Sequence, residues 1–355
     1  MQKLLTVIGA RPQFIKASVV SKAIKEQSGI EEIILHTGQH FDTNMSKVFF
    51  NQLSLPEPHF QLNIHGGSHG EMTGRMLTEI EQTLLLEKPD KVIVYGDTNS
   101  TLAGALAATK LHIPVAHIEA GLRSFNMQMP EEVNRILTDQ ISDILFCPTN
   151  TAIINLQREG FEHKPVGIHH VGDVMLDAAL FFAQHAISPT SIHNLSNFII
   201  ATLHRAENTD CYTRMVEITS ALNEIHNSVA PVILPLHPRT QKLIAKYELK
   251  LDVITIDPVG YLEMIWLLQH AGLVITDSGG IQKEAFFFGK QCITMRDQTE
   301  WVELVELGVN KLVGADSQKI KVAAQQHYGK AVKCNHELYG GGRTSVRIAS
   351  ILQGS

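Results

Sequence analysis

Cysteine is scarce in this sequence, and long apolar runs and targeting signals are missing. Only four of the 355 residues are cysteine, and none forms a Cys-x-x-Cys pair. We therefore expect reduced thiols rather than a disulfide framework. No apolar run approaches the ~18 residues that a membrane-spanning helix needs. The first residues show no basic leader or cleavage site, so the sequence predicts a cytoplasmic protein without a membrane partner.

An excess of positive charge is also absent. The 30 Lys and Arg residues oppose 36 Asp and Glu residues, which gives a formal net charge of −6. This balance argues against a protein that binds nucleic acid or anionic membranes through bulk charge. Any polyanionic ligand must therefore be held by a few placed groups.

Common cofactor and metal signatures are lacking. No Gly-x-Gly-x-x-Gly follows a predicted strand and no Gly-Lys-Ser/Thr occurs, which excludes a nicotinamide dinucleotide fingerprint and a P-loop. The 18 histidines include no His-Glu-x-x-His motif, and no cysteines or carboxylates stand at matching spacing. We expect no metal, and we interpret most of these histidines as ordinary surface or core residues.

The sequence is rich in short apolar segments that alternate with amphipathic ones. Each predicted strand is apolar throughout, as in parallel sheets buried on both faces, and the stretches between them have helical periodicity. This alternation predicts an α/β fold with two Rossmann-like, doubly wound parallel-sheet domains, and it fits an eightfold barrel poorly. The predicted strands span residues 4–8, 33–36, 92–95, 115–118, 144–147, 169–171, 198–203, 232–236, 253–256, 273–276, 292–295 and 311–313.

The boundary between the two domains is predicted near Gly172, after the sixth strand. The N-terminal domain then covers residues 1–172 and the C-terminal domain residues 173–342. A helix over residues 174–186 and a polar loop lead into the second domain. A last amphipathic helix, residues 344–352, follows three consecutive glycines, and its pattern does not reveal where it docks.

The turn after the first strand has the features of a small anion site. Gly9-Ala10-Arg11-Pro12 follows this strand, and Lys16 lies one helical turn further on the same side. Pro12 is suited to the first turn of a helix, which would place Arg11 beside exposed amides. A purely structural turn explains the same residues.

A second such turn follows the strand at residues 273–276. Asp277-Ser278-Gly279-Gly280 leads into a predicted helix over residues 281–288. The two glycines let backbone amides approach a diphosphate at the positive end of the helix dipole. Glu284, one turn later, could accept both ribose hydroxyls. The alternative is a tight turn with a solvated glutamate.

Carboxylates follow two strands of the first domain. Asp97 and Glu119 come directly after strands, and the carboxyl ends of parallel strands meet at one edge of the sheet. Glu131 and Glu132 open a helix just after Pro130. Capping of that helix explains one of these two glutamates but not the whole group, because converging carboxylates are costly as structure alone.

Cationic side chains are expected at the same strand ends. Such a crevice would hold cations for phosphate and carboxylates for proton transfer. The cations are Arg123 and Arg135 in the first domain, and His204-Arg205 and His237-Pro238-Arg239 in the second.

Several motifs occur together and in order along the chain. They are Gly9-Ala10-Arg11-Pro12 with Lys16, Gly38-Gln39-His40, Gly96-Asp97-Thr98, His117-Ile118-Glu119-Ala120-Gly121-Leu122-Arg123, Pro130-Glu131-Glu132-Val133-Asn134-Arg135, Asp277-Ser278-Gly279-Gly280-Ile281-Gln282-Lys283-Glu284-Ala285 and Tyr339-Gly340-Gly341-Gly342. With them, nearly the whole chain resembles the non-hydrolysing UDP-N-acetylglucosamine 2-epimerases.

The resemblance implies a glycosyltransferase-B arrangement with the UDP-sugar in a cleft between the domains. It further implies a last helix (residues 343–355) that returns to the first domain, a homodimer and no cofactor. It assigns Asp97, Glu119 and Glu131 as catalytic carboxylates and places His204 near the diphosphate. The other residues that it implies in contact with the UDP-sugar are Arg11, Lys16, Ser278, Gly279, Gly280 and Glu284; the expected substrate-binding set also includes Arg123, Arg135 and His237.

The implied reaction is the conversion of UDP-N-acetylglucosamine to UDP-N-acetylmannosamine. UDP leaves C1 while C2 loses its proton, and it re-adds to the resulting glycal after protonation on the opposite face. Which carboxylate serves which face stays open. The alternatives are a hydrolysing epimerase, a glycosyltransferase of the same fold, which needs fewer carboxylates at the sugar, and a non-catalytic UDP-sugar sensor.

Three departures from the better-known branch concern the sugar. The first turn has Ala10 where many members have threonine, Phe41-Asp42-Thr43-Asn44-Met45 lengthens a loop, and the last predicted site helix carries Lys283 and an aromatic run at residues 286–288. These features resemble a sub-branch that includes epimerases of UDP-2,3-diacetamido-2,3-dideoxyglucuronate. The lengthened loop lies where some bacterial members bind a second, activating substrate molecule. The aromatic run is interpreted as core packing.

Overall fold

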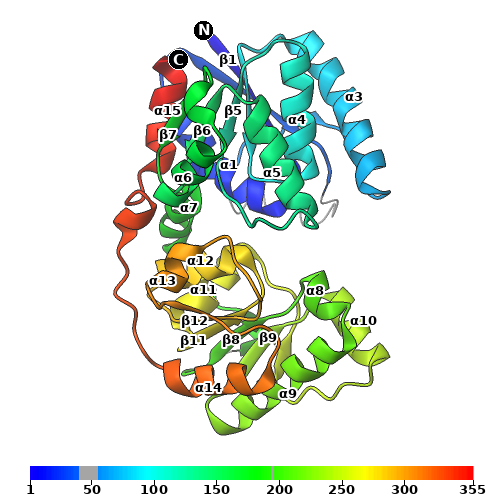
Figure 1. The fold of residues 1–355 in the computed structure, drawn as a ribbon, viewed down its shortest axis with the longest axis vertical. Coiled ribbons are helices and arrows are strands. Elements are labelled where there is room, and N and C mark those ends of the chain that lie inside the picture. Colours follow the sequence, from blue (N-terminus) through cyan, green and yellow to red (C-terminus); the bar gives the residue numbers. More distant parts are fainter. Residues whose placement is uncertain (40–54, 193–194, 355) are drawn as a thin grey trace. The chain divides into compact units, whose positions relative to one another are not determined.

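The computed structural model describes residues 1–39, 55–192 and 195–354, and the loop Phe41–Met45 and His40 lie outside this part of the chain. The chain forms two compact units (Figure 1). Unit 1 comprises Met1–Phe181 and His336–Ser355, and unit 2 comprises Phe182–Asn335. Each is described by itself below.

Unit 1 is built on a parallel sheet with helices on both faces. Among the described residues this sheet has seven strands in the order β3-β2-β1-β4-β5-β6-β7. The strands are β1 (Gln2–Ile8), β2 (Ile30–His36), β3 (Phe60–Gln61), β4 (Lys91–Tyr95), β5 (Val115–Ile118), β6 (Ile144–Cys147) and β7 (Gly167–His170). The helices are α1 (Arg11–Lys25), α3 (His69–Glu87), α4 (Asn99–Lys110), α5 (Pro130–Ile141), α6 (Asn150–Arg158), α7 (Val174–Ala183) and α15 (Thr344–Gly354).

Unit 2 repeats this plan. Its described residues form a six-stranded parallel sheet in the order β10-β9-β8-β11-β12-β13. The strands are β8 (Ile199–Thr202), β9 (Val232–Pro235), β10 (Ile254–Ile256), β11 (Leu273–Thr276), β12 (Cys292–Thr294) and β13 (Asn310–Leu312). The helices are α8 (Ala206–Thr209), α9 (Tyr212–Ser228), α10 (Pro238–Lys246), α11 (Tyr261–His270), α12 (Gly279–Phe287), α13 (Val302–Glu306) and α14 (Ser317–His327).

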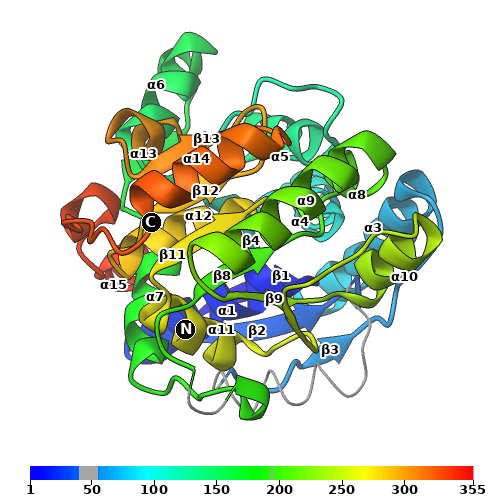
Figure 2. The same cartoon turned by 90° about the horizontal axis from the view of Figure 1, so that it is seen from below.

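The central strands β4, β5, β6, β8 and β11 are buried along their whole length because both faces of each sheet are covered. In β8, Ile199 and Ala201 pack into the core under α9 and α14, whereas Ile200 packs into the core under α11 and α12. Figure 1 shows these two helix layers on opposite sides of the sheet, and Figure 2 shows α9 and α14 side by side. Alternation of side chains along a strand feeds both layers, and this requires a continuous apolar run.

The prediction of two doubly wound parallel sheets is confirmed. All twelve predicted strands form, with ends that differ by up to three residues. The sequence pattern did not reveal β3, the two residues Phe60 and Gln61 at the edge of the first sheet. A segment this short and only partly buried carries no period that a pattern can detect.

The position of α15 answers the question that its pattern left open. This helix belongs to unit 1, where it packs against α1. The buried carboxylate of Asp177 in α7 accepts hydrogen bonds from two amides in the first turn of α15, those of Thr344 (3.1 Å) and Ser345 (2.7 Å). Gly172 and Gly340 touch, since a Cβ atom on Gly172 would lie 2.6 Å from the Cα atom of Gly340.

A search of the described residues for a helix long and apolar enough to cross a membrane finds none.

Candidate active site

The turn after β1 is tied to the turn after β4 by one buried side chain. The Oε1 atom of Gln13 accepts hydrogen bonds from the amides of Gly9 (2.8 Å) and Ala10 (2.9 Å). Its Nε2 atom donates to the carbonyl oxygen of Tyr95 at 2.9 Å. Gln13 therefore already binds two of the amides that the predicted anion site needs. Anion binding at this turn then depends on side chains, such as that of Arg11, the first residue of α1.

Asp97 stands just beyond the carboxyl end of β4, where the first half of α5 holds it. Its carboxylate forms an ion pair with Arg135, and its carbonyl oxygen accepts a hydrogen bond from Asn134 Nδ2 at 2.9 Å. The Asp97 side chain stays about one-third exposed, at 32 %. The helix thus orients this carboxylate while leaving it open to a ligand.

Glu119 stands at the matching position after the neighbouring strand β5. Its carboxylate is ion-paired with Lys16 of α1, and the two side chains are only 12 % and 10 % exposed. Glu119 has a φ of +75°, a left-handed conformation that costs roughly 1–2 kcal/mol for a residue with a side chain. Such strain is found most often at functional positions.

Gly96 lies against both members of the Lys16–Glu119 ion pair. A Cβ atom on Gly96 would lie 3.2 Å from Glu119 Oε2 and 3.5 Å from Lys16 Nζ, and the next residue is Asp97. The structure therefore places Glu119 and Lys16 against Gly96, the residue before Asp97.

The two glutamates that open α5 have separate surroundings. Glu131 lies in the first turn and is exposed. Glu132 is fully buried and accepts hydrogen bonds from the amides of Ser124 (2.9 Å) and Phe125 (2.8 Å), and from Arg135 Nη1 (2.8 Å). Glu132 therefore holds the loop after β5 and orients Arg135, whereas Glu131 remains available to a ligand.

Arg123 lies in a buried chain of charges instead of an open position. Its Nη1 atom donates to Asp139 Oδ2 at 2.7 Å, and its Nε and Nη2 atoms donate to the Glu159 carboxylate at 2.6 and 2.7 Å. The Arg123 side chain is 1 % exposed. We therefore assign Arg123 to the framework of the site, and the expected substrate contact has no support from its surroundings.

His204 is the exposed histidine at the carboxyl end of β8 in unit 2. The carboxylate of Asp277, fully buried after β11, accepts the amides of His204 and Arg205 at 3.0 Å each. Asp277 Oδ1 also lies 3.2 Å from His204 Nδ1. The buried carboxylate therefore lies beside the imidazole, and partners of this kind can set the orientation of a histidine ring. The sequence pattern alone had assigned no role to Asp277.

The turn at the start of α12 has one crowded and one open glycine. A Cβ atom on Gly279 would lie 2.3 Å from Glu300 Oε1, and the Glu300 carboxylate is held by Arg296 Nη1 at 2.9 Å. Arg296 is a buried cation, at 1 % exposure, that the sequence analysis missed. Around Gly280 a Cβ atom would meet nothing within 4 Å.

The remaining predicted residues of unit 2 lie at the start of α12 and at the start of α10. Ser278 is the residue before α12, and its amide donates to Thr276 Oγ1 at 2.9 Å. Glu284 is buried one turn into α12. His237 precedes α10 at the end of β9, is exposed, and its Nδ1 atom accepts the amide of Arg239 at 3.3 Å.

Lys283 is buried beside these groups. Its Nζ atom lies 3.8 Å from the centre of the Trp301 ring, which is a cation–π contact. In the aromatic run that follows, Phe286 and Phe287 are buried and Phe288 is partly buried against the core of unit 2. These positions agree with the interpretation of the run as core packing.

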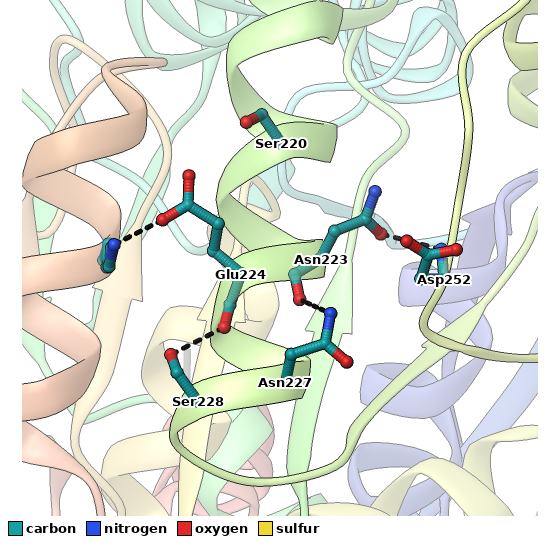
Figure 3. A pocket seen from close by; sticks show the side chains of 7 residues that line it. Ser220, Asn223, Glu224, Asn227, Ser228 and Asp252 are labelled. Carbon is teal, nitrogen blue, oxygen red and sulfur yellow. Dashed lines mark hydrogen bonds and ion pairs between the residues drawn. The ribbon is translucent and has the colours of Figure 1, made fainter.

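A polar hollow of about 430 Å³ lies elsewhere on unit 2 (Figure 3). It is formed by the last turns of α9, by α14 and by the residue Asp252 before β10, so it opens at the amino-terminal edge of the sheet. None of the predicted site residues lines it, and ligands of open α/β sheets bind at the opposite edge. We place no candidate site in this hollow.

The part of the chain that the structure describes contains no group of three or more His, Cys, Asp or Glu side chains that could hold a metal ion.

Comparison with known proteins identifies the family to which these motifs belong. The family model described as UDP-N-acetylglucosamine 2-epimerase matches residues 22–353. The chain is 68 % identical over 350 residues to the UDP-2,3-diacetamido-2,3-dideoxy-D-glucuronate 2-epimerase of Pseudomonas aeruginosa, which covers 99 % of both proteins. It is 35 % identical to the UDP-N-acetylglucosamine 2-epimerase of Escherichia coli, over 99 % of this chain and 98 % of that protein.

A solved structure gives the same result at the level of the fold. The crystal structure of the Methanocaldococcus jannaschii UDP-GlcNAc 2-epimerase in complex with UDP-GlcNAc and UDP is similar, with a TM-score of 0.91, 43 % identity and complete coverage of both chains. The resemblance carried by the motifs is confirmed: this chain belongs to the UDP-N-acetylglucosamine 2-epimerase family of isomerases.

Proposed function

We propose that this protein inverts C2 of a UDP-linked 2-acetamido sugar, and that its substrate is UDP-2,3-diacetamido-2,3-dideoxy-D-glucuronate. The observation that carries the choice of sugar is the 68 % identity to the Pseudomonas enzyme of that name, against 35 % to the Escherichia coli UDP-N-acetylglucosamine 2-epimerase. UDP-N-acetylglucosamine is the second candidate, because the similar Methanocaldococcus jannaschii structure contains it.

In the proposed reaction, a carboxylate takes the proton from C2 while the bond between C1 and the UDP oxygen breaks. The electron pair of the C1–O bond leaves with UDP, and a C1=C2 double bond forms. Delivery of a proton to the opposite face of C2 and re-addition of UDP complete the inversion. The chemistry needs proton-transfer groups on both faces of C2, and Asp97, Glu119 and Glu131 are the carboxylates proposed for this work.

The cations of unit 1 orient two of these carboxylates. Lys16 pairs with Glu119 and Arg135 pairs with Asp97, so neither carboxylate is free to turn away from the sugar. Each cation also offsets part of the negative charge of these carboxylates, which reduces their repulsion of a diphosphate-bearing substrate. Pre-organised pairs of this kind reduce the reorganisation that accompanies charge movement in the transition state.

The groups of unit 2 are proposed to hold the diphosphate. His204 presents Nε2 because Asp277 binds its other nitrogen. The turn Ser278–Gly280 lies at the positive end of the α12 dipole, where anions are stabilised. Together they would stabilise the negative charge that develops as UDP leaves, and Glu284 is proposed to bind the ribose.

The test is an incubation with each of the two sugar nucleotides in D₂O. The proposal expects deuterium at C2 and accumulation of the C2 epimer of the diacetamido-glucuronate, with UDP retained. Turnover of UDP-N-acetylglucosamine alone would move the assignment to the second candidate. Free sugar with stoichiometric UDP would identify a hydrolysing enzyme, and transfer that needs an acceptor would identify a glycosyltransferase.

The crowded glycine predicts a selective loss of UDP binding. Gly279→Ala should lower the affinity for UDP about tenfold, which corresponds to ~1.4 kcal/mol, because the new methyl group meets the pinned Glu300 carboxylate at the start of α12. Titration calorimetry with UDP measures this effect. Gly280→Ala is the matched control for space, since nothing lies within 4 Å of its Cβ position, and equal losses in both variants would contradict this explanation.

We also propose that the protein is a homodimer. Leu85 and Leu86 at the end of α3 are 55 % and 71 % exposed, and adjacent exposed apolar side chains are typical of surfaces that a second copy covers. Light scattering should give a mass of about twice 39.3 kDa. The double change Leu85→Glu and Leu86→Glu should halve this mass, and a monomeric wild-type protein would rule out the proposal.

A further inference from the structure

His117 is a fully buried histidine in β5 whose two ring nitrogens both face acceptors. Its Nδ1 atom lies 2.7 Å from Asp139 Oδ1, and its Nε2 atom lies 2.7 Å from the carbonyl oxygen of Gly96. A carbonyl oxygen cannot donate a hydrogen bond. The Nε2 atom must therefore carry a proton, and the charge of the ring depends on Nδ1.

The surroundings of Asp139 decide which atom carries the proton in the second contact. Asp139 Oδ2 accepts hydrogen bonds from the Gly121 amide at 3.1 Å and from Arg123 Nη1 at 2.7 Å. Burial raises the pKa of Asp139, but the net shift is downward, and apart from His117 the charge and hydrogen bond of Arg123 act in this direction. An ionised Asp139 only accepts, so Nδ1 of His117 also donates and the ring is an imidazolium.

The charges around the ring balance only if it is protonated. His117, Asp139 of α5, Arg123 after β5 and Glu159 at the end of α6 then alternate in sign along one hydrogen-bonded chain. The thiol of Cys147 in β6 lies near Asp139 and Arg123 and stays neutral, because burial raises its pKa. A neutral ring would leave this largely buried chain with one uncompensated negative charge, which is costly.

The proton on His117 Nε2 binds the carbonyl oxygen of Gly96, the residue before Asp97. The carbonyl that it binds belongs to the peptide unit between Gly96 and Asp97, and this unit is planar. Fixing the carbonyl therefore fixes the direction in which the chain enters Asp97. Gly96 itself has a φ of +63° and lies against Glu119 and Lys16, so a shift of this peptide would disturb both ion pairs.

We propose that His117 is an imidazolium that donates from both ring nitrogens, and that it is a positioning residue, which holds the Gly96–Asp97 peptide and with it the place of the Asp97 carboxylate beside Glu119 and Lys16. The kinetic part of this inference rests on the proposed function, whereas the protonation state does not. Both halves of α5 are then attached to this part of the chain. The first half holds Asp97 through Asn134 and Arg135, and the second half holds the Gly96 carbonyl through Asp139 and His117.

The protonation state is tested without substrate. Long-range ¹H–¹⁵N spectra of the full chain labelled with ¹⁵N-histidine should show one ring with both nitrogens protonated at pH 8. His117→Gln assigns this signal by removing it. His163, whose side chain is 80 % exposed, provides a comparison ring outside this buried network. A neutral His117 ring at pH 8 overturns the proposal, whatever the enzyme's substrate.

The positioning role is tested by two substitutions that each keep one hydrogen bond. In His117→Gln the amide nitrogen takes the place of Nε2 and can still bind the Gly96 carbonyl. In His117→Asn it takes the place of Nδ1 and binds Asp139 only. We expect the asparagine variant to lose about 10²-fold in kcat, which is typical of misplaced catalytic groups, with KM and UDP affinity within about twofold. The glutamine variant should retain kcat within about tenfold.

The control is His226→Gln in unit 2, where His226 Nδ1 accepts the Val232 amide at 3.0 Å. This change should lower the melting temperature but leave kcat unchanged. Equal kcat for the two His117 variants, or a loss confined to KM, overturns the positioning role. If either variant fails to fold, the wild-type spectra still decide the charge of the ring. Absence of turnover in the wild-type protein with both sugars would instead refute the proposed function.

Discussion

Asp97→Asn is expected to lower turnover by about 10²-fold or more, the contribution typical of a proton-transfer group. Asparagine keeps the size of the side chain, and its oxygen can still accept from Arg135, which binds this carboxylate in the wild-type protein. The variant therefore loses the ability to take or give a proton but not its place in the site. Steady-state kinetics and the rate of deuterium entry at C2 measure the effect.

Glu119→Gln tests the same step at the neighbouring strand. Its turnover should fall by a similar factor, about 10²-fold, and Lys16 loses its charged partner as well. Glu81→Gln is the matched control, because Glu81 is exposed on α3 and should leave the rate unchanged. Full rate in both Asp97→Asn and Glu119→Gln would contradict the roles assigned to these carboxylates.

Asp277→Asn is the second change for which we expect a large loss, about 10²–10³-fold in kcat. The buried Asp277 carboxylate receives two backbone amides and lies against His204 Nδ1. Removing its charge frees the imidazole to take the other tautomer, and in a serine-protease triad the equivalent change costs about 10⁴-fold. His204 is more exposed than a triad histidine, at 49 % for its side chain, so a smaller loss is expected here.

A double-mutant cycle separates this effect from a general loss of structure. If Asp277 acts through the imidazole, Asp277→Asn should cost little in a His204→Ala background, because the two residues work as a unit. The same large loss in both backgrounds would show that Asp277 acts through the turn before α8 instead. Thermal unfolding of each variant reports whether the turn itself has been disturbed.

Much of the fold followed from local patterns. Strands buried on both faces must be apolar throughout, so the sequence revealed their positions and their parallel pairing, whereas β3 has only two residues and a partly exposed side. The positions of Asp97 and Glu119 just beyond the ends of the neighbouring strands β4 and β5 also followed, because parallel strands expose their carboxyl ends at one edge.

Side-chain partners were harder to predict than positions. Pattern alone did not separate the exposed Glu131 from the buried Glu132, and it grouped Arg123 with the ligand-facing cations although two carboxylates enclose it. Gln13 gave no signal for its bonds to the turn after β1. A buried polar residue in an apolar strand, such as His117, was the one available sign of an internal network.

The sequence by itself determined the two parallel sheets and the family, and it predicted the strand ends at which the proposed chemistry takes place, because periodicity and short motifs are local properties of the chain. Only the tertiary structure decided which charges pair. Lys16 and Glu119 stand 103 residues apart, and His204 and Asp277 are joined across 73. Whether a cation is left for a ligand or pairs with a carboxylate of the protein depends on packing between such distant segments. A buried charge needs such a partner, because leaving it unpaired is costly.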